Sequence, residues 1–231
     1  MYDCPQCHDI GYLHPLADGK VDYSSTIPCQ CRAEEIEKER TERILRLCEL
    51  PYGSDNLRFE TFKAHNDSLR AALKYARELA DETTELKWLT LIGDVDVGKT
   101  HLAIAICRKW LERKKPARYV FVPMILDQLR RGYSKQGENS FDSQMEFLMN
   151  VHLLVLDDLG AQKQKDREDG SWAIEKLETI IDYRYINGLP LVVTANVPVD
   201  DFSFRIASRL RRFEAGKIIL IDAEEFRKVR K

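Results

Sequence analysis

The fold is decided by the stretch Gly93-Asp94-Val95-Asp96-Val97-Gly98-Lys99-Thr100, which directly follows the apolar run Trp88–Ile92. Its glycines and its Lys-Thr pair have the spacing of a loop that wraps phosphate groups between a strand and a helix. Glycine lets backbone N–H groups point inward, and a helix that begins near Lys99 adds the positive end of its dipole. A glycine turn before Lys-Thr can also be purely structural, but the strand before it and the helical pattern after it favour phosphate binding.

The residues of this loop have expected roles toward ATP. Lys99 would bring a positive charge to the β- and γ-phosphates, and the Thr100 hydroxyl would ligate Mg²⁺. Asp94 and Asp96 would repel polyphosphate if they faced it, so we expect them to point outward and to reduce ATP affinity somewhat. We expect the nucleotide to be contacted by Gly93, Asp94, Val95, Asp96, Val97, Gly98, Lys99, Thr100 and His101.

A second apolar run, His152–Leu156, ends in two carboxylates, Asp157 and Asp158. In a parallel sheet such residues lie at the edge where ligands bind. Asp157 would therefore hold Mg²⁺ together with Thr100, and Asp158 could orient or deprotonate the attacking water. Acidic residues also form turns after strands, so this assignment depends on the loop upstream.

Strand and helix patterns alternate from about residue 55 onward. The fully apolar runs predict strands at 88–92, 119–122, 152–158, 191–194 and 217–221, and helical patterns span 69–79, 99–113 and 172–187. Strands of this kind, separated by helices, predict an α/β domain in which helices cover both faces of a parallel sheet. No run approaches the roughly 18 apolar residues of a membrane helix, and no secretory signal is recognisable, so we expect a cytoplasmic protein without a membrane partner.

Three further polar residues are candidates for a catalytic role. Asn196 follows the predicted strand 191–194 and could sense the γ-phosphate or position the water, or it could simply form a turn before Val197-Pro198. Arg205 and Arg209 are four residues apart and share one helical face. An arginine on that face could reach the γ-phosphate of a neighbouring subunit.

The cysteines are concentrated near the N-terminus, as Cys4-Pro5-Gln6-Cys7 and Cys29-Gln30-Cys31. Two close pairs around a short loop can provide four thiolates for structural Zn²⁺, and residues 1–31 are too few to fold on apolar burial alone. Alternatives are free or redox-active thiols, a c-type haem attachment at Cys4–His8, and His8 or His14 as substitute ligands. Residues 32–54 read as a charged linker helix.

Taken together, these motifs resemble the AAA+ ATPase domain of the DnaC/DnaI helicase-loader family, which shares its core with IstB-type transposition ATPases. The resemblance covers about residues 55–231. It implies that Asn196 is the sensor-1 asparagine, that Arg205 and Arg209 belong to the arginine-finger motif, and that the C-terminal helical lid is missing. It rests on the ordered stretches Gly98–Ala103, Asp157–Gly160, Trp172–Leu177, Ile181–Tyr185, Leu189-Pro190, Arg205–Leu210 and Phe226-Arg227.

The resemblance also implies partners: a DnaB-like replicative hexameric helicase, single-stranded DNA, and further copies of the chain through ATP-dependent self-association. Zinc-bound N-terminal domains of similar spacing occur in some helicase loaders, where they tend to contact the helicase. Candidate DNA contacts, which could equally be ordinary solvated surface, are Arg130, Arg131, Tyr133 and the loop Gln162–Lys165.

Two other functions stay open at this point. An IstB-type transposition ATPase would share the nucleotide site, although the cysteine module argues against it. A nucleotide-binding interaction module with negligible hydrolysis is favoured by Asp94, by Asp96 and by aspartate, in place of the usual glutamate, at position 158. A helicase loader that binds ATP and hydrolyses it slowly accounts for the largest number of these features.

Overall fold

The computed structural model describes residues 3–133, 137, 140–160 and 167–224. It divides into two compact units, Met1–Arg46 and Leu47–Lys231. Helix α1 (Ala33–Cys48) runs across the boundary between them. The expected division into residues 1–31, 32–54 and 55–231 stays a prediction.

The N-terminal unit begins with two short antiparallel strand pairs. Strand β1 (Tyr12–Leu13) pairs with β4 (Ile27–Pro28), and β2 (Leu16–Ala17) pairs with β3 (Lys20–Val21). Among its described residues, most large apolar side chains are exposed, whereas two cysteines, Cys7 and Cys29, are buried. Because so little apolar surface is buried there, these strands need another source of stability.

The second unit contains a five-stranded sheet in which every strand is parallel to its neighbours. This architecture confirms the predicted α/β fold. In order across the sheet the strands are β6 (Ala117–Phe121), β7 (Leu153–Asp157), β8 (Leu191–Ala195), β5 (Trp88–Gly93) and β9 (Gly216–Ile221).

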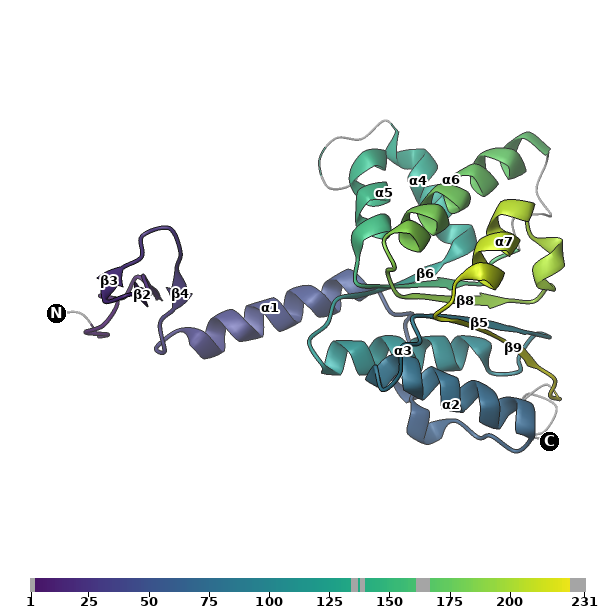
Figure 1. Ribbon diagram of the computed structural model, residues 1–231, viewed down its shortest axis with the longest axis horizontal. Helices are drawn as coiled ribbons and strands as arrows, with labels where there is room; N and C mark the ends of the chain where they lie inside the picture. The colour runs from purple at the N-terminus through teal and green to yellow at the C-terminus, as the bar shows by residue number, and fades with distance from the viewer. Residues whose placement is uncertain (1–2, 134–136, 138–139, 161–166, 225–231) are drawn as a thin grey trace. The chain divides into compact units, whose positions relative to one another are not determined.

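Helices cover both faces of this sheet (Figure 1). One face carries α2 (Asp67–Asp81) and α3 (Lys99–Glu112). The other face carries α4 (Val122–Gly132), α5 (Phe141–Asn150), α6 (Arg167–Ile186) and α7 (Phe204–Arg212). Short 3₁₀ turns occur at Ser54–Asn56, Phe59–Thr61 and Val199–Asp201.

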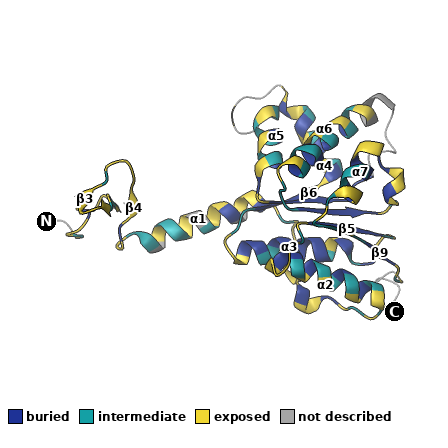
Figure 2. Ribbon diagram, in the orientation of Figure 1, coloured by how far each residue is buried: buried dark blue, intermediate teal, exposed yellow. Residues whose placement is uncertain are grey.

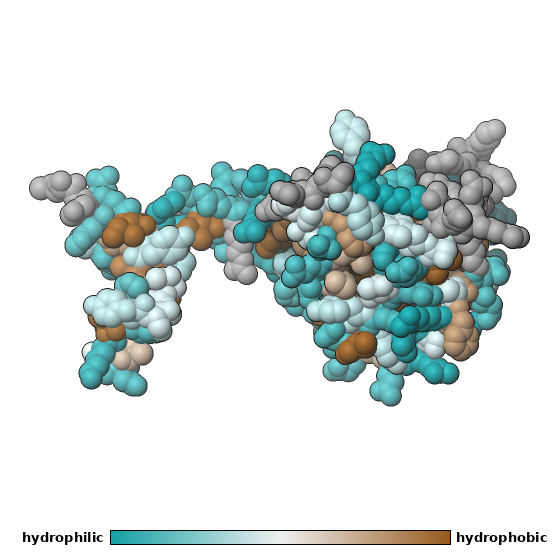
Figure 3. All heavy atoms as spheres, turned by 90° about the horizontal axis from the view of Figure 1, so that it is seen from above, coloured by the Kyte–Doolittle hydropathy of each residue, from teal (hydrophilic) through white to brown (hydrophobic). Residues whose placement is uncertain are grey.

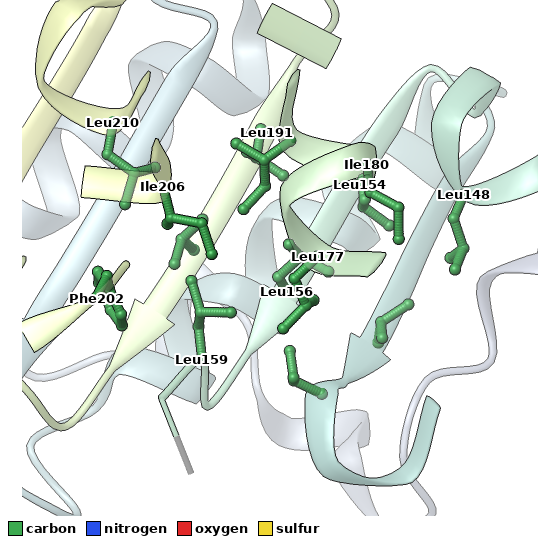
Figure 4. Close-up of a cluster of buried hydrophobic side chains, with 14 of the residues drawn as sticks. Leu148, Leu154, Leu156, Leu159, Leu177, Ile180, Leu191, Phe202, Ile206 and Leu210 are labelled. Atoms are coloured by element: carbon green, nitrogen blue, oxygen red, sulfur yellow. The ribbon is translucent and has the colours of Figure 1, made fainter. Parts of the chain in front are cut away.

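Strands β5, β7 and β8 are buried between these two helical layers, whereas the edge strand β9 is partly exposed (Figure 2). All residues of β7 and β8 are buried, as their apolar sequences predict. Leucine and isoleucine side chains from β7 and β8 meet those of α5, α6 and α7 in one cluster (Figure 4). At the edge of this cluster, Trp88 stacks on Phe213 with ring centres 4.6 Å apart.

A buried arginine connects the starts of two neighbouring strands, β7 and β8. Arg184 Nη1 donates to the carbonyl oxygens of Leu148 and Met149 at 3.1 and 3.0 Å. Its Nη2 donates to those of His152 and Pro190 at 3.1 and 2.5 Å. Burial lowers the pKa of Arg184 to about 9, so it remains a cation at neutral pH. Because these carbonyls precede β7 and β8, Arg184 fixes where both strands begin.

Several predicted element bounds were wrong. The strand predicted at 119–122 spans Ala117–Phe121, and Val122 already belongs to α4, because Pro123 fits the first turn of a helix, where its N–H is not needed. Helix α5 was missed, although the Ser140 hydroxyl caps it by accepting from the N–H of Ser143. Within the described residues, no helix combines the length and apolar character that a membrane crossing requires.

Candidate nucleotide-binding site and metal centre

The predicted phosphate-binding loop joins the end of β5 at Gly93 to the start of α3 at Lys99. A Cβ at Gly93 would collide with the carbonyl oxygen of Ile221, and Gly98 has a left-handed φ of 96°. Glycine is therefore required at both ends of the loop. Asp96 also has a left-handed φ, of 64°, which aspartate tolerates better than most residues.

The ammonium group of Lys99 lies inside this loop. Its Nζ donates to the carbonyl oxygens of Gly93 at 2.8 Å and Asp94 at 2.5 Å. The residue is only 6% exposed, and this burial lowers the pKa of Lys99. The carboxylates of Asp157, Asp158 and Asp94 oppose that shift. A positive charge is thus held where the sequence predicts the phosphates.

Asp157 is surrounded by three hydroxyl groups from three different elements. Thr100 Oγ1 at the start of α3 lies 3.0 and 3.1 Å from its two carboxylate oxygens. Tyr119 on β6 donates to Oδ2 at 2.6 Å, and Thr194 on β8 donates to Oδ1 at 2.6 Å. The structure therefore brings together Thr100 and Asp157, the two residues predicted to hold Mg²⁺.

Asp158 continues this network toward β8. Its backbone N–H donates to Thr194 Oγ1 at 2.9 Å, and its Oδ1 accepts from the amide of Asn196 at 2.8 Å. Burial, and then the neighbouring charge of Asp157, raise the pKa of Asp158. The predicted catalytic pair, Asp158 and Asn196, is thus in direct contact beside the predicted metal ligands.

The side chain of His101 points away from this network. Its Nε2 lies 2.8 Å from the carbonyl oxygen of Arg58, and its ring meets Phe62 edge-on with centres 5.2 Å apart. Burial lowers the pKa of His101, so the neutral ring is favoured. A contribution of His101 to phosphate binding would come from its backbone N–H in the first turn of α3.

The two candidate finger arginines are held within their own chain by Asp182, a residue that the sequence reasoning did not single out. Arg205 Nε lies 2.6 Å from Asp182 Oδ2, and Arg209 Nε lies 2.6 Å from Oδ1. The Arg209 guanidinium also stacks over the Tyr185 ring at 4.6 Å. In this chain both arginines contact α6 and not the phosphate-binding loop.

A cavity of about 580 Å³ adjoins Thr100 and Asp157. Its walls come from β6, from α4 and from the segment that follows α1. Tyr119, Ile104 and Met124 make it largely apolar, while Arg118 and Gln128 add polar groups. The site thus has space for a ligand beside its carboxylate.

In the N-terminal unit, the four predicted cysteine ligands lie together. The Sγ atoms of Cys4, Cys7, Cys29 and Cys31 are all within 4.8 Å of one another. Two pairs, Cys4–Cys29 and Cys7–Cys31, are 3.6 and 3.5 Å apart. A tetrahedral zinc ion with bonds of about 2.3 Å places its sulfurs about 3.8 Å apart, so this donor set fits zinc.

The pKa shifts of these thiols differ in direction, and the neighbouring thiol of Cys7, followed by burial, raises the pKa of Cys31. The backbone N–H groups of Cys7 and Gln6 lower the pKa of Cys4 to about 6. The N–H of Gly11 donates to Cys7 Sγ at 3.3 Å. His14 instead lies 2.9 Å from the Ser25 carbonyl oxygen. Among the described residues, the group that could hold a metal consists of the four cysteines, without His8 or His14.

Two of the candidate DNA contacts, Arg130 and Tyr133, lie in an aromatic cluster that joins α4, α5 and α6. Tyr133 stacks on Phe141 with ring centres 4.3 Å apart, and its hydroxyl accepts from Trp172 Nε1 at 3.2 Å. The Arg130 guanidinium lies 4.8 Å from the centre of the Trp172 ring. Lys176 adds a cation over Phe141. The loop Gln162–Lys165 and the pair Phe226-Arg227 lie outside the described residues.

The protein is of the AAA+ P-loop class. This class is defined by the strand order β6-β7-β8-β5-β9, by the glycine loop that leads into Lys99 and Thr100 of α3, and by the carboxylates at the end of β7. The chain belongs to the family of IstB-like ATP binding proteins, whose model matches residues 22–208.

Solved structures that share its fold include those of DnaI and DnaC. The crystal structure of DnaI has a TM-score of 0.62 and 22% identity, and the match covers 79% of this chain and 98% of that one. The crystal structure of the DnaC helicase loader has a TM-score of 0.62 and 22% identity, over 74% of this chain and 100% of that one. At this identity the likeness establishes the fold alone.

Curated relatives include two proteins named replicative helicase loader. DnaC of Escherichia coli strain K12 is 26% identical over 156 residues, which are 67% of this chain and 61% of that protein. DnaI of Bacillus subtilis strain 168 is 26% identical over 122 residues, 52% of this chain and 37% of that protein. The phage-like element PBSX protein XkdC of the same strain is 22% identical over 86% of this chain and 73% of its own length. The chain thus spans less than two thirds of either helicase loader.

Proposed function

We propose that this chain is an ATP-dependent helicase loader, which binds Mg²⁺ and ATP, hydrolyses ATP slowly and delivers a hexameric replicative helicase to single-stranded DNA. The observation that carries the ATP part is the Thr100–Asp157 contact of 3.0 Å beside the buried ammonium of Lys99. The helicase part is supported by the relatives named DnaC and DnaI.

The chain's own residues would divide the work at the nucleotide. Lys99 would exchange its two loop carbonyls for phosphate oxygens, and the N–H groups at the start of α3 would bind the same oxygens. Thr100 and Asp157 would hold Mg²⁺, which when bound offsets the negative charge of the β- and γ-phosphates. Asp158 would orient the attacking water and accept its proton.

Slow hydrolysis follows from the position of Asp158. Its side chain is one methylene shorter than glutamate, and one of its oxygens already accepts from Asn196. Its raised pKa makes it a better proton acceptor once ionised. A base of limited reach gives ATP a long lifetime on the protein, which suits a switch that times an assembly.

The proposed helicase contact is the apolar surface of the N-terminal unit. Leu16 and Tyr23 are among the large apolar side chains exposed there, and Figure 3 shows hydrophobic residues at its surface. Exposed apolar groups gathered on so small a module are typical of a protein-binding surface. Zinc bound by its cysteines would give that surface its shape. Among the described residues of this unit, the other large apolar side chains that are exposed belong to Ile10, Tyr12, Val21 and Ile27.

Single-stranded DNA would bind at the aromatic cluster of Tyr133, Phe141 and Trp172. Bases stack on aromatic rings without regard to sequence, and nearby cations neutralise the phosphates. Arg130 and Lys176 already lie over rings of this cluster. The side chain of Tyr133 is exposed and can receive a base.

Arg209 is the proposed trans-acting finger, and Arg205 is the alternative. Both would have to exchange Asp182 for the γ-phosphate of a neighbouring copy. This exchange would couple ATP binding to self-association.

One experiment separates the candidate functions. The full chain is titrated with ATP and Mg²⁺, and its ATP hydrolysis is measured alone, with a DnaB-like hexamer plus single-stranded DNA, and with duplex DNA plus a transposase. Stimulation by helicase and single-stranded DNA supports the loader. Stimulation by transposase alone supports the IstB-type alternative, and tight binding with no hydrolysis in any mixture supports the interaction module.

A further inference from the structure

Asp157 is held on both sides by the strands that flank it. Phe121 of β6 is the register partner of Asp157, and Tyr119 lies two residues earlier on that strand. The phenol reaches along the strand to Oδ2 at 2.6 Å, while Thr194 on the opposite strand reaches Oδ1 at 2.6 Å. Each carboxylate oxygen therefore has one hydroxyl donor fixed in the sheet.

The third donor, Thr100, differs from these two. Its hydroxyl shares its hydrogen between both oxygens of Asp157 at 3.0 and 3.1 Å, and Thr100 is exposed at the start of α3. A Thr100 hydroxyl that ligates a metal through an oxygen lone pair keeps its hydrogen as a donor to Asp157, but its position then follows the metal. Tyr119 and Thr194 are the donors to Asp157 whose positions are set by the sheet.

We propose that Tyr119 is a positioning residue for the metal ligand Asp157, and this inference rests on the proposed Mg²⁺–ATP function. The Tyr119 hydroxyl holds Oδ2 while the Thr194 hydroxyl holds Oδ1. Together they keep the Asp157 carboxylate in the same orientation with and without nucleotide. Groups that orient a metal ligand typically change metal affinity by 10-fold or more when they are removed.

A purely structural role for the Tyr119 hydroxyl predicts a different outcome. Tyr119 is 7% exposed, and its ring packs in the sheet and lines the 580 Å³ cavity beside Thr100. Phenylalanine would keep this packing and remove one hydroxyl. A structural role would then alter thermal stability or all nucleotide binding alike, whereas a positioning role alters the Mg²⁺ dependence specifically.

The test is a titration of full-length wild type and Tyr119→Phe with a fluorescent non-hydrolysable ATP analogue, in EDTA and at increasing Mg²⁺. Mg²⁺ should enhance binding of the analogue, and we expect Tyr119→Phe to raise the Mg²⁺ concentration that gives half of this enhancement roughly 10-fold. Its affinity in EDTA and its melting temperature should match those of wild type. The matched control is Tyr183→Phe, which also removes one hydroxyl, the one that donates a hydrogen bond to Asn150 Oδ1 at 2.7 Å. This control should change neither the affinity for the analogue in EDTA nor its Mg²⁺ dependence.

The outcomes distinguish this inference from the proposed function. A wild type whose analogue binding does not respond to Mg²⁺ overturns both. A wild type that responds to Mg²⁺, with the same midpoint in Tyr119→Phe, overturns the role of Tyr119 and leaves the ATP site standing. If Tyr119→Phe weakens analogue binding equally in EDTA and in Mg²⁺, the positioning role of Tyr119 is also overturned, because its hydroxyl would then support the phosphate-binding loop as a whole.

Discussion

The side-chain amide of Asn196 donates a hydrogen bond of 2.8 Å to Oδ1 of Asp158. The two residues follow adjacent strands, β8 and β7. Asp158 has a left-handed φ of 61°, and its N–H donates to Thr194 Oγ1. Strand β8 therefore determines both the backbone and the carboxylate direction of the proposed base.

Asp158→Asn should lower ATP hydrolysis roughly 100-fold, which is typical for loss of a general base. Nucleotide binding should persist, because Lys99, Thr100 and Asp157 are unchanged. Steady-state phosphate release and analogue binding measure the two effects. Asp81→Asn, an exposed change at the end of α2, is the control. An Asp158→Asn variant as active as wild type would contradict the assignment.

Mixing two inactive variants should restore ATP hydrolysis if Arg209 acts on a neighbouring copy. Lys99→Ala loses its own nucleotide site but keeps the arginine, and Arg209→Ala keeps the site but loses the arginine. An equimolar mixture can form interfaces that contain one intact copy of each. Arg211→Ala, whose partner in this chain is Asp200, should remain active alone. A mixture no more active than its parts would refute action in trans.

Zinc should be present at about one ion per chain, held by four cysteines. Elemental analysis of the full chain measures it. Cys7→Ser should lose the metal, whereas Cys107→Ala, which alters a buried thiol of α3, should retain it. A chain without zinc, or one with a haem absorption band, would exclude this assignment.

Tyr133→Ala and Trp172→Ala should each weaken binding to single-stranded DNA roughly 10-fold, the usual loss when a stacking side chain is removed. Tyr75→Ala is the matched control, since Lys74 and Lys217 lie over its ring on α2, across the sheet. Fluorescence anisotropy at several salt concentrations measures affinity and its electrostatic part. Equal losses for all three variants would argue against the cluster as the binding site.

The features of the fold and of the candidate site that could be predicted from the sequence are those encoded by contiguous residues. The loop Gly93–Thr100 and the apolar strand before Asp157 each carry their own pattern, so the α/β fold and the Thr100–Asp157 pair could be expected. The four cysteines were likewise expected to lie together, because they form two close pairs joined by a short loop.

Other features depend on packing between segments far apart in the chain. Tyr119 reads as one more strand residue between Arg118 and Val120, and only the register of β6 on β7 brings its hydroxyl to Asp157. Asp182 reads as an ordinary helix surface residue until α7 packs on α6 and delivers Arg205 and Arg209. Such contacts follow from tertiary structure, which local patterns do not encode.

We propose that ATP on this chain controls its association with a hexameric helicase. The most direct measurement is co-sedimentation of the full chain with a DnaB-like hexamer in ATP, in ADP and without nucleotide, using wild type and Lys99→Ala. We expect nucleotide-dependent binding and transfer of the hexamer to single-stranded DNA by wild type, and no nucleotide response from Lys99→Ala. A wild type that binds Mg²⁺ and ATP but ignores the helicase in every nucleotide state would contradict the claim.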